Sequence, residues 1–236
     1  MLERVEFVRD VKISINEKPW VNSTEEQKKI DDLWEVEVKK LSQSYNGLLY
    51  LTDPATLKLD GSQLSACVRQ TDYKSFLYWR YMGCPADKVD IFGSSALVSS
   101  DGAVLLGEMA SHTSNASKIY FCAGSLDEGD RVGDEIDIRV NIQRELSEET
   151  GYQFPLSSFD GEKMIVMAEG FVSVIKVLKL SETAEEIIAK ANAFFASEEN
   201  SELSRLVAIW NEADMPIEKM PRYAVLATQK ILSMLN

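Results

Sequence analysis

The sequence has a single histidine and only three cysteines among its 236 residues. Cys67, Cys84 and Cys122 are widely spaced, which suits neither a disulfide framework nor a zinc site and favours a reducing, cytoplasmic setting. No apolar run approaches the roughly 18 residues of a membrane-spanning helix, and the N-terminus lacks the apolar core of a signal peptide. We therefore expect a cytoplasmic protein that makes no contact with a membrane.

Basic residues are scarce relative to acidic ones. The 25 lysines and arginines are outnumbered by 38 aspartates and glutamates, which gives a formal net charge of -13. Long nucleic acid requires a basic protein surface, so it is excluded as a partner. A small phosphorylated ligand remains compatible, because a bound metal ion reverses the sign of the charge locally.

The most informative stretch is RELSEETG, at residues 144–151. In a helix, Glu145, Glu148 and Glu149 would share one face, because residues three and four apart are neighbours. Three like charges repel one another unless a cation lies among them, and carboxylate oxygens are ligands that Mg²⁺ prefers. Gly151 suits the left-handed position that ends a helix. Taken alone, such a turn is also typical of a solvated acidic helix face.

A glycine-containing segment, AGSLDEGD, lies upstream at residues 123–130. Together the two segments resemble the Nudix box, G-x5-E-x7-R-E-U-x-E-E-x-G-U, in which U is a bulky apolar residue. The first half matches at Gly124, with Asp130 in place of the first glutamate and about six extra residues near 131–136. The second half matches at Arg144, Glu145, Leu146, Glu148, Glu149, Gly151 and Tyr152.

The resemblance implies a member of the Nudix hydrolase superfamily that uses Mg²⁺, or Mn²⁺ in its place, to hydrolyse the pyrophosphate bond of a nucleoside diphosphate derivative. It assigns metal binding to Glu145, Glu148, Glu149, Gly124 and Asp130. Arg144 would orient a box glutamate. Glu148 is one candidate for the general base, and Glu169, at a break between two apolar runs, is the other.

The segment TDYKSF, at residues 71–76, is similar to one that precedes the core in a Nudix branch acting on nucleoside diphosphate sugars. That similarity implies a nucleoside diphosphate sugar as the small substrate, contacted by Tyr73 and Lys74. A structural interpretation is equally compatible with the pattern. In it, Asp72 caps an amphipathic helix that places its apolar side chains in the core, namely Phe76, Leu77 and Met82.

The element pattern predicts an α/β protein. A Nudix-type α/β/α sandwich with a mixed sheet is expected over residues 89–236, preceded by an α+β extension over residues 1–88. The extension would open with a pair of strands within 1–22, followed by a helix that Ser23 or Thr24 caps and that runs to about Lys40. It could also provide a homodimer interface, although no residue demonstrates one.

Within 89–236, Asp101-Gly102 predicts a hairpin, and residues 118–126 a strand that leads into the glycine loop. Asp134 would cap the glutamate-bearing helix, whose buried face would carry Ile138, Ile142 and Leu146. Residues 164–180, broken at Glu169-Gly170, are expected to form two strands or one long bent strand. They would be followed by helices at 181–196 and 223–235, with a strand near 206–210 between them.

The extra residues near 131–136 are expected to form a surface loop that covers or widens the site and contributes little to stability. This loop, with aspartate at the first acidic position, also favours a second class of function. The chain would then be a catalytically weak or inactive Nudix-fold domain that binds nucleotides or regulates another activity. The retained cluster of Glu145, Glu148 and Glu149 favours the enzyme, because a pure binding domain has little need of three clustered carboxylates.

Overall fold

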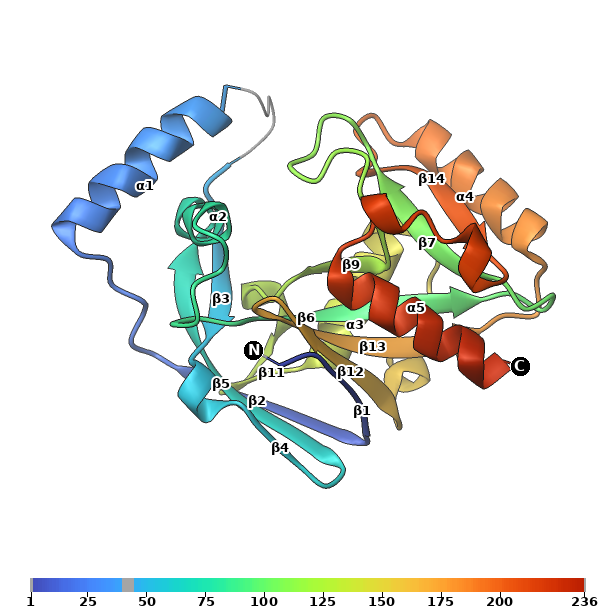
Figure 1. Ribbon diagram of the computed structural model, residues 1–236, viewed down its shortest axis with the longest axis horizontal. Helices are drawn as coiled ribbons and strands as arrows, with labels where there is room; N and C mark the ends of the chain where they lie inside the picture. The colour runs from blue at the N-terminus through green and yellow to red at the C-terminus, as the bar shows by residue number, and fades with distance from the viewer. Residues whose placement is uncertain (1, 40–44, 236) are drawn as a thin grey trace.

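The larger of two mixed sheets forms the centre of the fold (Figure 1). The computed structural model describes residues 2–39 and 45–235, and every statement below concerns those residues. In spatial order the strands of this sheet are β1 (Arg4–Val8), β12 (Lys163–Ala168), β13 (Phe171–Lys179), β6 (Asp90–Val98), β7 (Val104–Met109) and β14 (Leu203–Ile209), with β8 (Ile119–Tyr120) beside β7 and β9 (Cys122–Ser125) beside β6.

The smaller sheet lies beside the larger one and is joined to it by a bridge between Thr52 and Val89. It is mixed as well, because β2 and β5 run parallel while the other pairs are antiparallel. Its strands in spatial order are β10 (Arg131–Val132), β11 (Glu135–Ile136), β2 (Asp10–Asn16), β5 (Gln63–Asp72) and β3 (Leu48–Thr52), with β4 (Lys58–Asp60) beside β5.

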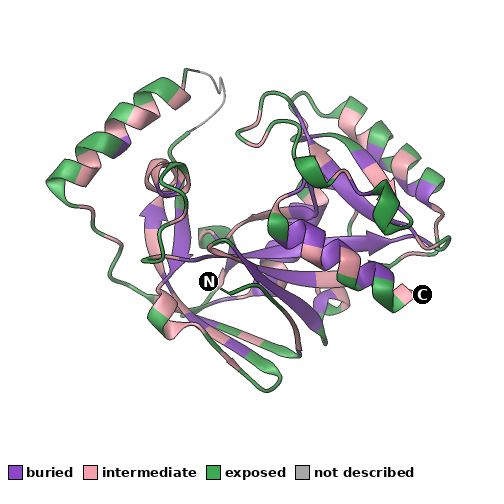
Figure 2. Cartoon of the chain, in the orientation of Figure 1, coloured by how far each residue is buried: buried purple, intermediate pink, exposed green. Residues whose placement is uncertain are grey.

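Helices cover both faces of the larger sheet. On one face α3 (Ile138–Thr150) packs on β6 and β9 and α4 (Ala184–Ser197) on β14, while α5 (Arg222–Leu235) covers the other face (Figure 1). β6 is buried along its whole length between these layers (Figure 2). The predicted α/β/α sandwich with a mixed sheet is therefore confirmed. None of the described helices is long and apolar enough to cross a membrane.

Two helices belong to the N-terminal part and pack against each other: α1 (Thr24–Glu37) and α2 (Tyr73–Tyr81). Ser23 caps α1 as predicted, and the helix ends at Glu37; the expected end at Lys40 lies outside the described residues. Asp72 caps α2 as predicted, but Met82 is exposed and Trp79 is buried in its place. Short 3₁₀ helices complete the fold: η1 (Pro54–Thr56), η2 (Glu128–Asp130), η3 (Leu156–Phe159), η4 (Glu212–Asp214) and η5 (Ile217–Lys219).

The two opening strands are not a pair, contrary to expectation. β1 joins β12 of the larger sheet, whereas β2 joins β5 and β11 of the smaller sheet. The chain thus passes from one sheet to the other at Arg9. The division into 1–88 and 89–236 stays a prediction, and the structure places one strand of the first segment within the sheet of the second.

The capping residue of α3 is Asp137, not Asp134. The Asp137 carboxylate accepts a hydrogen bond from the Arg139 backbone N–H at 3.0 Å, whereas the Asp134 side chain is fully exposed in the turn before the helix. At the other end, Gly151 adopts the predicted left-handed conformation, with φ of 73°. The predicted apolar stripe is confirmed, because Ile138, Ile142 and Leu146 are all buried.

Most of the remaining expectations for residues 89–236 are confirmed: the hairpin at Asp101-Gly102, the break at Glu169-Gly170, the strand at β14 and the two late helices. The strand expected over 118–126 is instead divided at Phe121 into β8 and β9. Gly124 therefore lies within β9, where it pairs with Gly93 of β6, and not in a loop.

The insertion at 131–136 is a hairpin of β10 and β11, not a surface loop. Ile136 pairs with Ile13 of β2 and is buried, while Val132 stays exposed. β2 has a free edge with which β11 pairs. In the strands formed there, exposed and buried side chains alternate. The hairpin ties the polypeptide just before α3 to the smaller sheet, so its removal would expose core surface.

We expect Ile136→Ala to lower the free energy of unfolding by about 2–5 kcal/mol, because the substitution leaves a cavity at a buried site. Val132→Ala, in the same hairpin but exposed, should change it by less than about 0.5 kcal/mol. Urea unfolding followed by circular dichroism gives both values. Equal, small effects would restore the interpretation of this segment as a surface loop.

Candidate functional site

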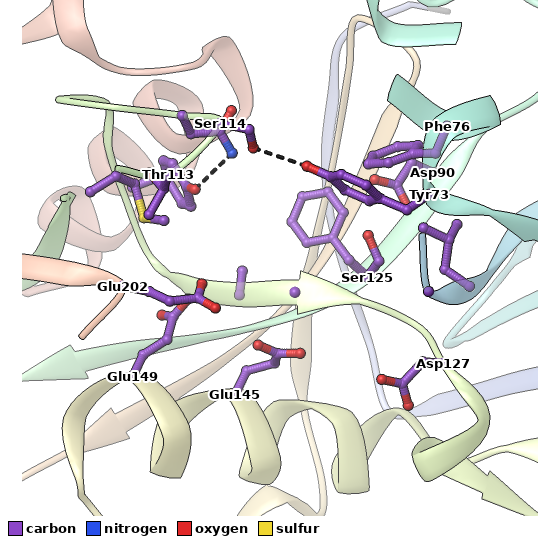
Figure 3. A pocket seen from close by; sticks show the side chains of 18 of the residues that line it. Tyr73, Phe76, Asp90, Thr113, Ser114, Ser125, Asp127, Glu145, Glu149 and Glu202 are labelled. Carbon is purple, nitrogen blue, oxygen red and sulfur yellow. Dashed lines mark hydrogen bonds between the residues drawn. The ribbon is translucent and has the colours of Figure 1, made fainter. Parts of the chain in front are cut away.

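A cavity of about 660 Å³ lies beside β9, between α3 and α2. Its walls differ in chemistry. Carboxylates of Glu145, Glu149 and Glu202 gather on one side, whereas Tyr73, Phe76 and Asp90 lie on the other (Figure 3). β9 passes between these two ends, and β6 is its one strand partner among the described pairings. Side chains from both ends therefore reach the same space past its free edge.

α3 brings two of the three clustered glutamates to the cavity as buried groups. Glu145 and Glu149 are 9% and 4% exposed, whereas the side chain of Glu148 is 60% exposed at the cavity rim. Gly124 makes room for the first of them. A Cβ atom on Gly124 would lie 2.2 Å from the nearest carboxylate oxygen of Glu145, closer than any real contact. Only glycine allows β9 and this glutamate to approach so closely.

Burial dominates the electrostatics of these carboxylates. It raises the pKa of Glu145 to about 8, against the lowering effect of the Arg144 charge. The pKa of Glu149 is also raised well above its usual value, first by burial and then by the negative charges of Glu145 and Glu202. One oxygen of Glu149, Oε2, has no hydrogen-bond partner. A buried carboxylate oxygen without a hydrogen-bond partner is unfavourable while the group is charged, so Glu149 favours a proton or a bound cation beside it.

Arg144 is the cation nearest these glutamates. It donates to both carboxylate oxygens of Asp130 at 3.1 Å and forms ion pairs with Glu145 at 2.7 Å and Glu148 at 3.3 Å. Burial alone would lower the pKa of Arg144. The hydrogen bonds with Asp130 and the surrounding anions outweigh this effect, so the pKa lies above its usual value. Arg144 thus pairs with Glu145 and Glu148 and is itself held by Asp130.

Asp130 is completely buried and fully engaged by the protein. Besides Arg144, it accepts hydrogen bonds from the Asn141 side chain at 2.9 Å and from the Asp127 backbone N–H at 3.0 Å. It therefore fixes the turn after β9 to α3. Metal binding by Asp130 stays a prediction, and what the structure shows is that its hydrogen bonds hold this turn.

Asn141 is a central residue that sequence reasoning missed. Its Oδ1 accepts a hydrogen bond from the Gly93 backbone N–H at 2.8 Å, and its Nδ2 donates to Asp130 and, at longer range, to the Gly124 and Ser125 carbonyls. Asn141 thus connects α3 to both β6 and β9. A signal was present, because Asn141, Glu145 and Glu149 follow one another at i, i+4 and i+8 on one helix face.

Three other predicted site residues have different fates. Tyr73 lines the cavity, and its hydroxyl donates to Ser114 Oγ across the opening at 3.2 Å (Figure 3). Lys74 is not among the lining residues, and its ammonium group pairs with Asp31 of α1 at 2.6 Å. Glu169 lies in the turn between β12 and β13, where it lines a separate cavity with Cys84. The structure therefore does not bring Glu169 to the box glutamates.

Three acidic residues at the cavity, Asp90, Asp127 and Glu202, were not predicted as site residues. Glu202 precedes β14 and owes its place to the pairing of β14 with β7, so no local pattern marks it. Asp90 opens β6 and is 3% exposed, although it lines the cavity. Burial raises the pKa of Asp90 to about 7, against the lowering effect of Arg80. A charged residue at the first position of an apolar strand was the available signal.

The donor set at the acidic end suits a hard divalent cation. Carboxylate and carbonyl oxygens are the ligands that Mg²⁺ and Mn²⁺ accept, and Glu149 Oε2 is buried without a partner. Residues 2–39 and 45–235 contain no cluster of three or more His, Cys, Asp or Glu already arranged around a common point. Binding would therefore have to draw Glu145 from its contact with Arg144.

No protein-family model and no curated protein matches the sequence. Among solved structures, similarity is found to a NUDIX hydrolase from Nitrosomonas europaea, with 11% identity, coverage of 61% of this chain and 70% of that chain, and a TM-score of 0.38. The NUDIX domain of Shewanella oneidensis NrtR, complexed with ADP ribose, shows 16% identity over 62% and 87% of the chains, with a TM-score of 0.38.

A third similar structure is a bifunctional NMN adenylyltransferase/ADP ribose pyrophosphatase from Francisella tularensis, complexed with AMP and a manganese ion. It shows 11% identity over 68% of this chain and 46% of that chain, with a TM-score of 0.42. At this level of similarity, the function has to be argued from the residues of the chain itself.

The raised pKa values predict that the stability of the metal-free protein, measured with a chelator present, depends on pH. Glutamate in the unfolded chain ionises near pH 4.5, whereas folded Glu145 ionises near pH 8, so the folded state binds more protons between these values. The free energy of unfolding should therefore fall as pH rises from about 5 to 8. Glu149→Gln should make the slope shallower by up to about 1.4 kcal/mol per pH unit. Urea titrations at several pH values measure this slope. A slope that Glu149→Gln leaves unchanged would contradict the raised pKa of Glu149.

We expect Asp130→Ala to destabilise the protein by about 3–5 kcal/mol, because it leaves Arg144 and Asn141 without their shared partner in a buried setting. Asp134→Ala, four residues away and fully exposed, should cost less than about 0.5 kcal/mol. Thermal and urea unfolding of the two variants side by side test this. A mild effect of Asp130→Ala would mean that the turn after β9 is held by other contacts.

Proposed function

We propose that this chain is a divalent-cation-dependent hydrolase that cleaves the pyrophosphate bond of a nucleoside diphosphate derivative. The observation that carries the proposal is the placement of Glu145 and Glu149 as buried carboxylates facing the cavity, with one Glu149 oxygen unpartnered. Gly124 supports it, since its missing side chain leaves room for Glu145. A purely structural acidic helix would turn these groups to solvent, as it does Glu148.

A bound cation would neutralise the pyrophosphate and lower the pKa of a water molecule used for attack. Glu145, Glu149 and the Gly124 carbonyl would hold it, with Glu148 at the rim. Arg144 keeps Glu145 and Glu148 oriented through its ion pairs, and Asp130 keeps Arg144 in place. Such an arrangement acts by positioning the ligands, and Asp130 itself would not bind the metal.

Glu148 is the better of the two candidates for the general base. Its carboxylate is solvent-accessible at the cavity that contains Glu145 and Glu149, so it can exchange protons with water there. Glu169 lies on a different cavity, and we do not retain it. Tyr73 is kept as a substrate contact, whereas Lys74 is occupied by Asp31 on α1.

The derivative we favour is a nucleoside diphosphate sugar. The cavity volume of about 660 Å³ is that of a typical site for a small organic ligand, and it extends well beyond the acidic end. The aromatic side chains at the far end give a second surface on which a planar or sugar ring can pack. A homodimer built through residues 1–88 and a cytoplasmic location stay predictions.

One observation favours the alternative of a domain that binds nucleotides without hydrolysing them. Arg144 already neutralises Glu145 at 2.7 Å, and no ready metal cluster exists among the residues described. If that ion pair persists, the cavity would bind ligand but not activate water. Binding of nucleotides without turnover on any substrate, in the presence of Mg²⁺ or Mn²⁺, would establish this alternative.

We expect Glu149→Gln to lower the rate of hydrolysis by roughly two or more orders of magnitude, because it removes a charge that the cation needs while keeping the side-chain shape. Its melting temperature in chelator should be unchanged or higher, since the substitution removes a buried carboxyl group that is unfavourable to ionise. The assay measures phosphate release from UDP-, GDP-, ADP- and CDP-sugars with Mg²⁺. Glu162→Gln, exposed and outside the cavity, is the matched control. Turnover of Glu149→Gln at the wild-type rate would refute the metal assignment.

A further inference from the structure

The end of the cavity opposite the glutamates contains a buried carboxylate with nothing to bind. Asp90 lines the cavity and is 3% exposed, and its Oδ1 has no hydrogen-bond partner. A desolvated carboxylate oxygen of this kind is normally paired in a folded protein. Its side chain is drawn among those that surround the cavity, next to Phe76 and Tyr73 (Figure 3).

The nearest cation does not serve as its partner. Arg80 also lines the cavity, but its guanidinium group donates to Asn115 Oδ1 at 2.6 Å and lies over the ring of Phe76 at 5.6 Å. In the described part of the chain, no ion pair joins Arg80 to Asp90 within 4.0 Å. Asp90 is thus left free to accept hydrogen bonds from a ligand.

Aromatic rings surround Asp90 on the same side of the sheet. Phe92, two residues further along β6 and hence on the same face, meets Tyr223 edge-on with 5.2 Å between ring centroids. Phe171 lies 6.3 Å from Phe92, and Phe76 closes the far side from α2. A wall of apolar rings with one carboxylate in it suits a flat heterocycle that presents hydrogen-bond donors at its edge.

The spacing along β6 relates this aromatic end to the acidic end. Gly93 pairs with Gly124, which lies against Glu145, and Asp90 is three residues before Gly93. Three strand residues span about 10 Å. This backbone distance is on the scale of a nucleoside between its base edge and its phosphates, and one cavity is lined by both Asp90 and Glu145, so one nucleotide could reach both ends.

The bases differ in what they offer a carboxylate. Guanine presents two adjacent donors, N1–H and the 2-amino group, which match the two oxygens of a carboxylate. Adenine and cytosine place an acceptor beside their amino group, and uracil places its N3–H between two carbonyls. An unpaired carboxylate therefore attracts guanine and repels an edge oxygen or ring nitrogen of the other bases.

We propose that Asp90 and the surrounding aromatic side chains form a base-recognition site selective for guanine, a 2-amino-6-oxopurine. The proposal rests on the proposed function for the position of the phosphates, but it concerns a different part of the cavity. The substrate class becomes a guanosine diphosphate derivative, with the base at the aromatic end and the pyrophosphate at Glu145 and Glu149. Asp90 acts in specificity and not in the chemical step.

Binding of nucleoside 5′-monophosphates tests the proposal without turnover, because they contain no pyrophosphate bond. Calorimetry in the presence of Mg²⁺ should show GMP binding about 10- to 100-fold more tightly than AMP, UMP and CMP. IMP, which lacks only the 2-amino group, should bind more weakly than GMP. This comparison uses the unaltered protein and so does not depend on any variant folding.

Asp90→Asn keeps the shape of the side chain but points an amide N–H₂ at the donors of guanine. It should remove the preference for GMP, lowering GMP affinity by about 10- to 100-fold, while the affinities for AMP, UMP and CMP change by less than about threefold. Phe76→Leu, by contrast, should weaken all bases alike. Melting curves of both variants show whether they are folded.

Several results would overturn the proposal. The first is equal affinity for all five monophosphates, and the second is no binding of GMP at millimolar concentration. The third is a preference for AMP that Asp90→Asn removes, which would indicate a protonated carboxyl group paired with adenine. Hydrolysis assays run in parallel separate the two proposals. Hydrolysis without base preference refutes only the guanine site, whereas GMP selectivity without hydrolysis of any derivative supports the guanine site and refutes the enzyme.

Discussion

The buried contact among Asn141, Asp130 and Arg144 is the interaction on which the candidate site depends. Asn141 ties α3 to the backbone of β6, and Asp130 ties the turn after β9 to the same helix. All three groups are polar and largely withdrawn from water, and Asp130 is the partner shared by the other two, so its loss would leave donors of both Asn141 and Arg144 without an acceptor. The register of α3 against β9 is fixed by this contact, and with it the positions of Glu145 and Glu149.

The same contact explains why the insertion does not disrupt the site. Extra residues between Asp130 and α3 could have separated the two halves of the acidic motif. Instead, β10 and β11 leave and return as a hairpin, and the Asp137 backbone N–H donates to the Asp130 carbonyl at 2.9 Å. The inserted residues lie at the edge of the smaller sheet, where β11 pairs with β2. The halves therefore meet at the ends of the hairpin.

The cavity has two chemically different ends because two parts of the chain build it. α3 and β9 supply carboxylates and a glycine, while α2, β6 and α5 supply rings and Asp90. The hydroxyl contact between Tyr73 and Ser114 spans the opening and links the N-terminal part to the loop after β7. A ligand with one anionic end and one planar end matches this division, because each end of the cavity would contact a different part of the ligand.

The sequence by itself determined the elements whose signals are local. The acidic trio, Gly151 at the helix end, the Asp101-Gly102 hairpin and the Ser23 and Asp72 caps follow from spacing and backbone preference, which do not depend on distant residues. Long-range pairing decided the rest. β1 and β2 have the same alternating pattern yet enter different sheets, and the free edge of β2 turned an apparent loop into a hairpin. Only the tertiary structure placed Glu202 and Asp90 at the cavity and Glu169 away from it, because no residue near them in sequence specifies which strands become their neighbours.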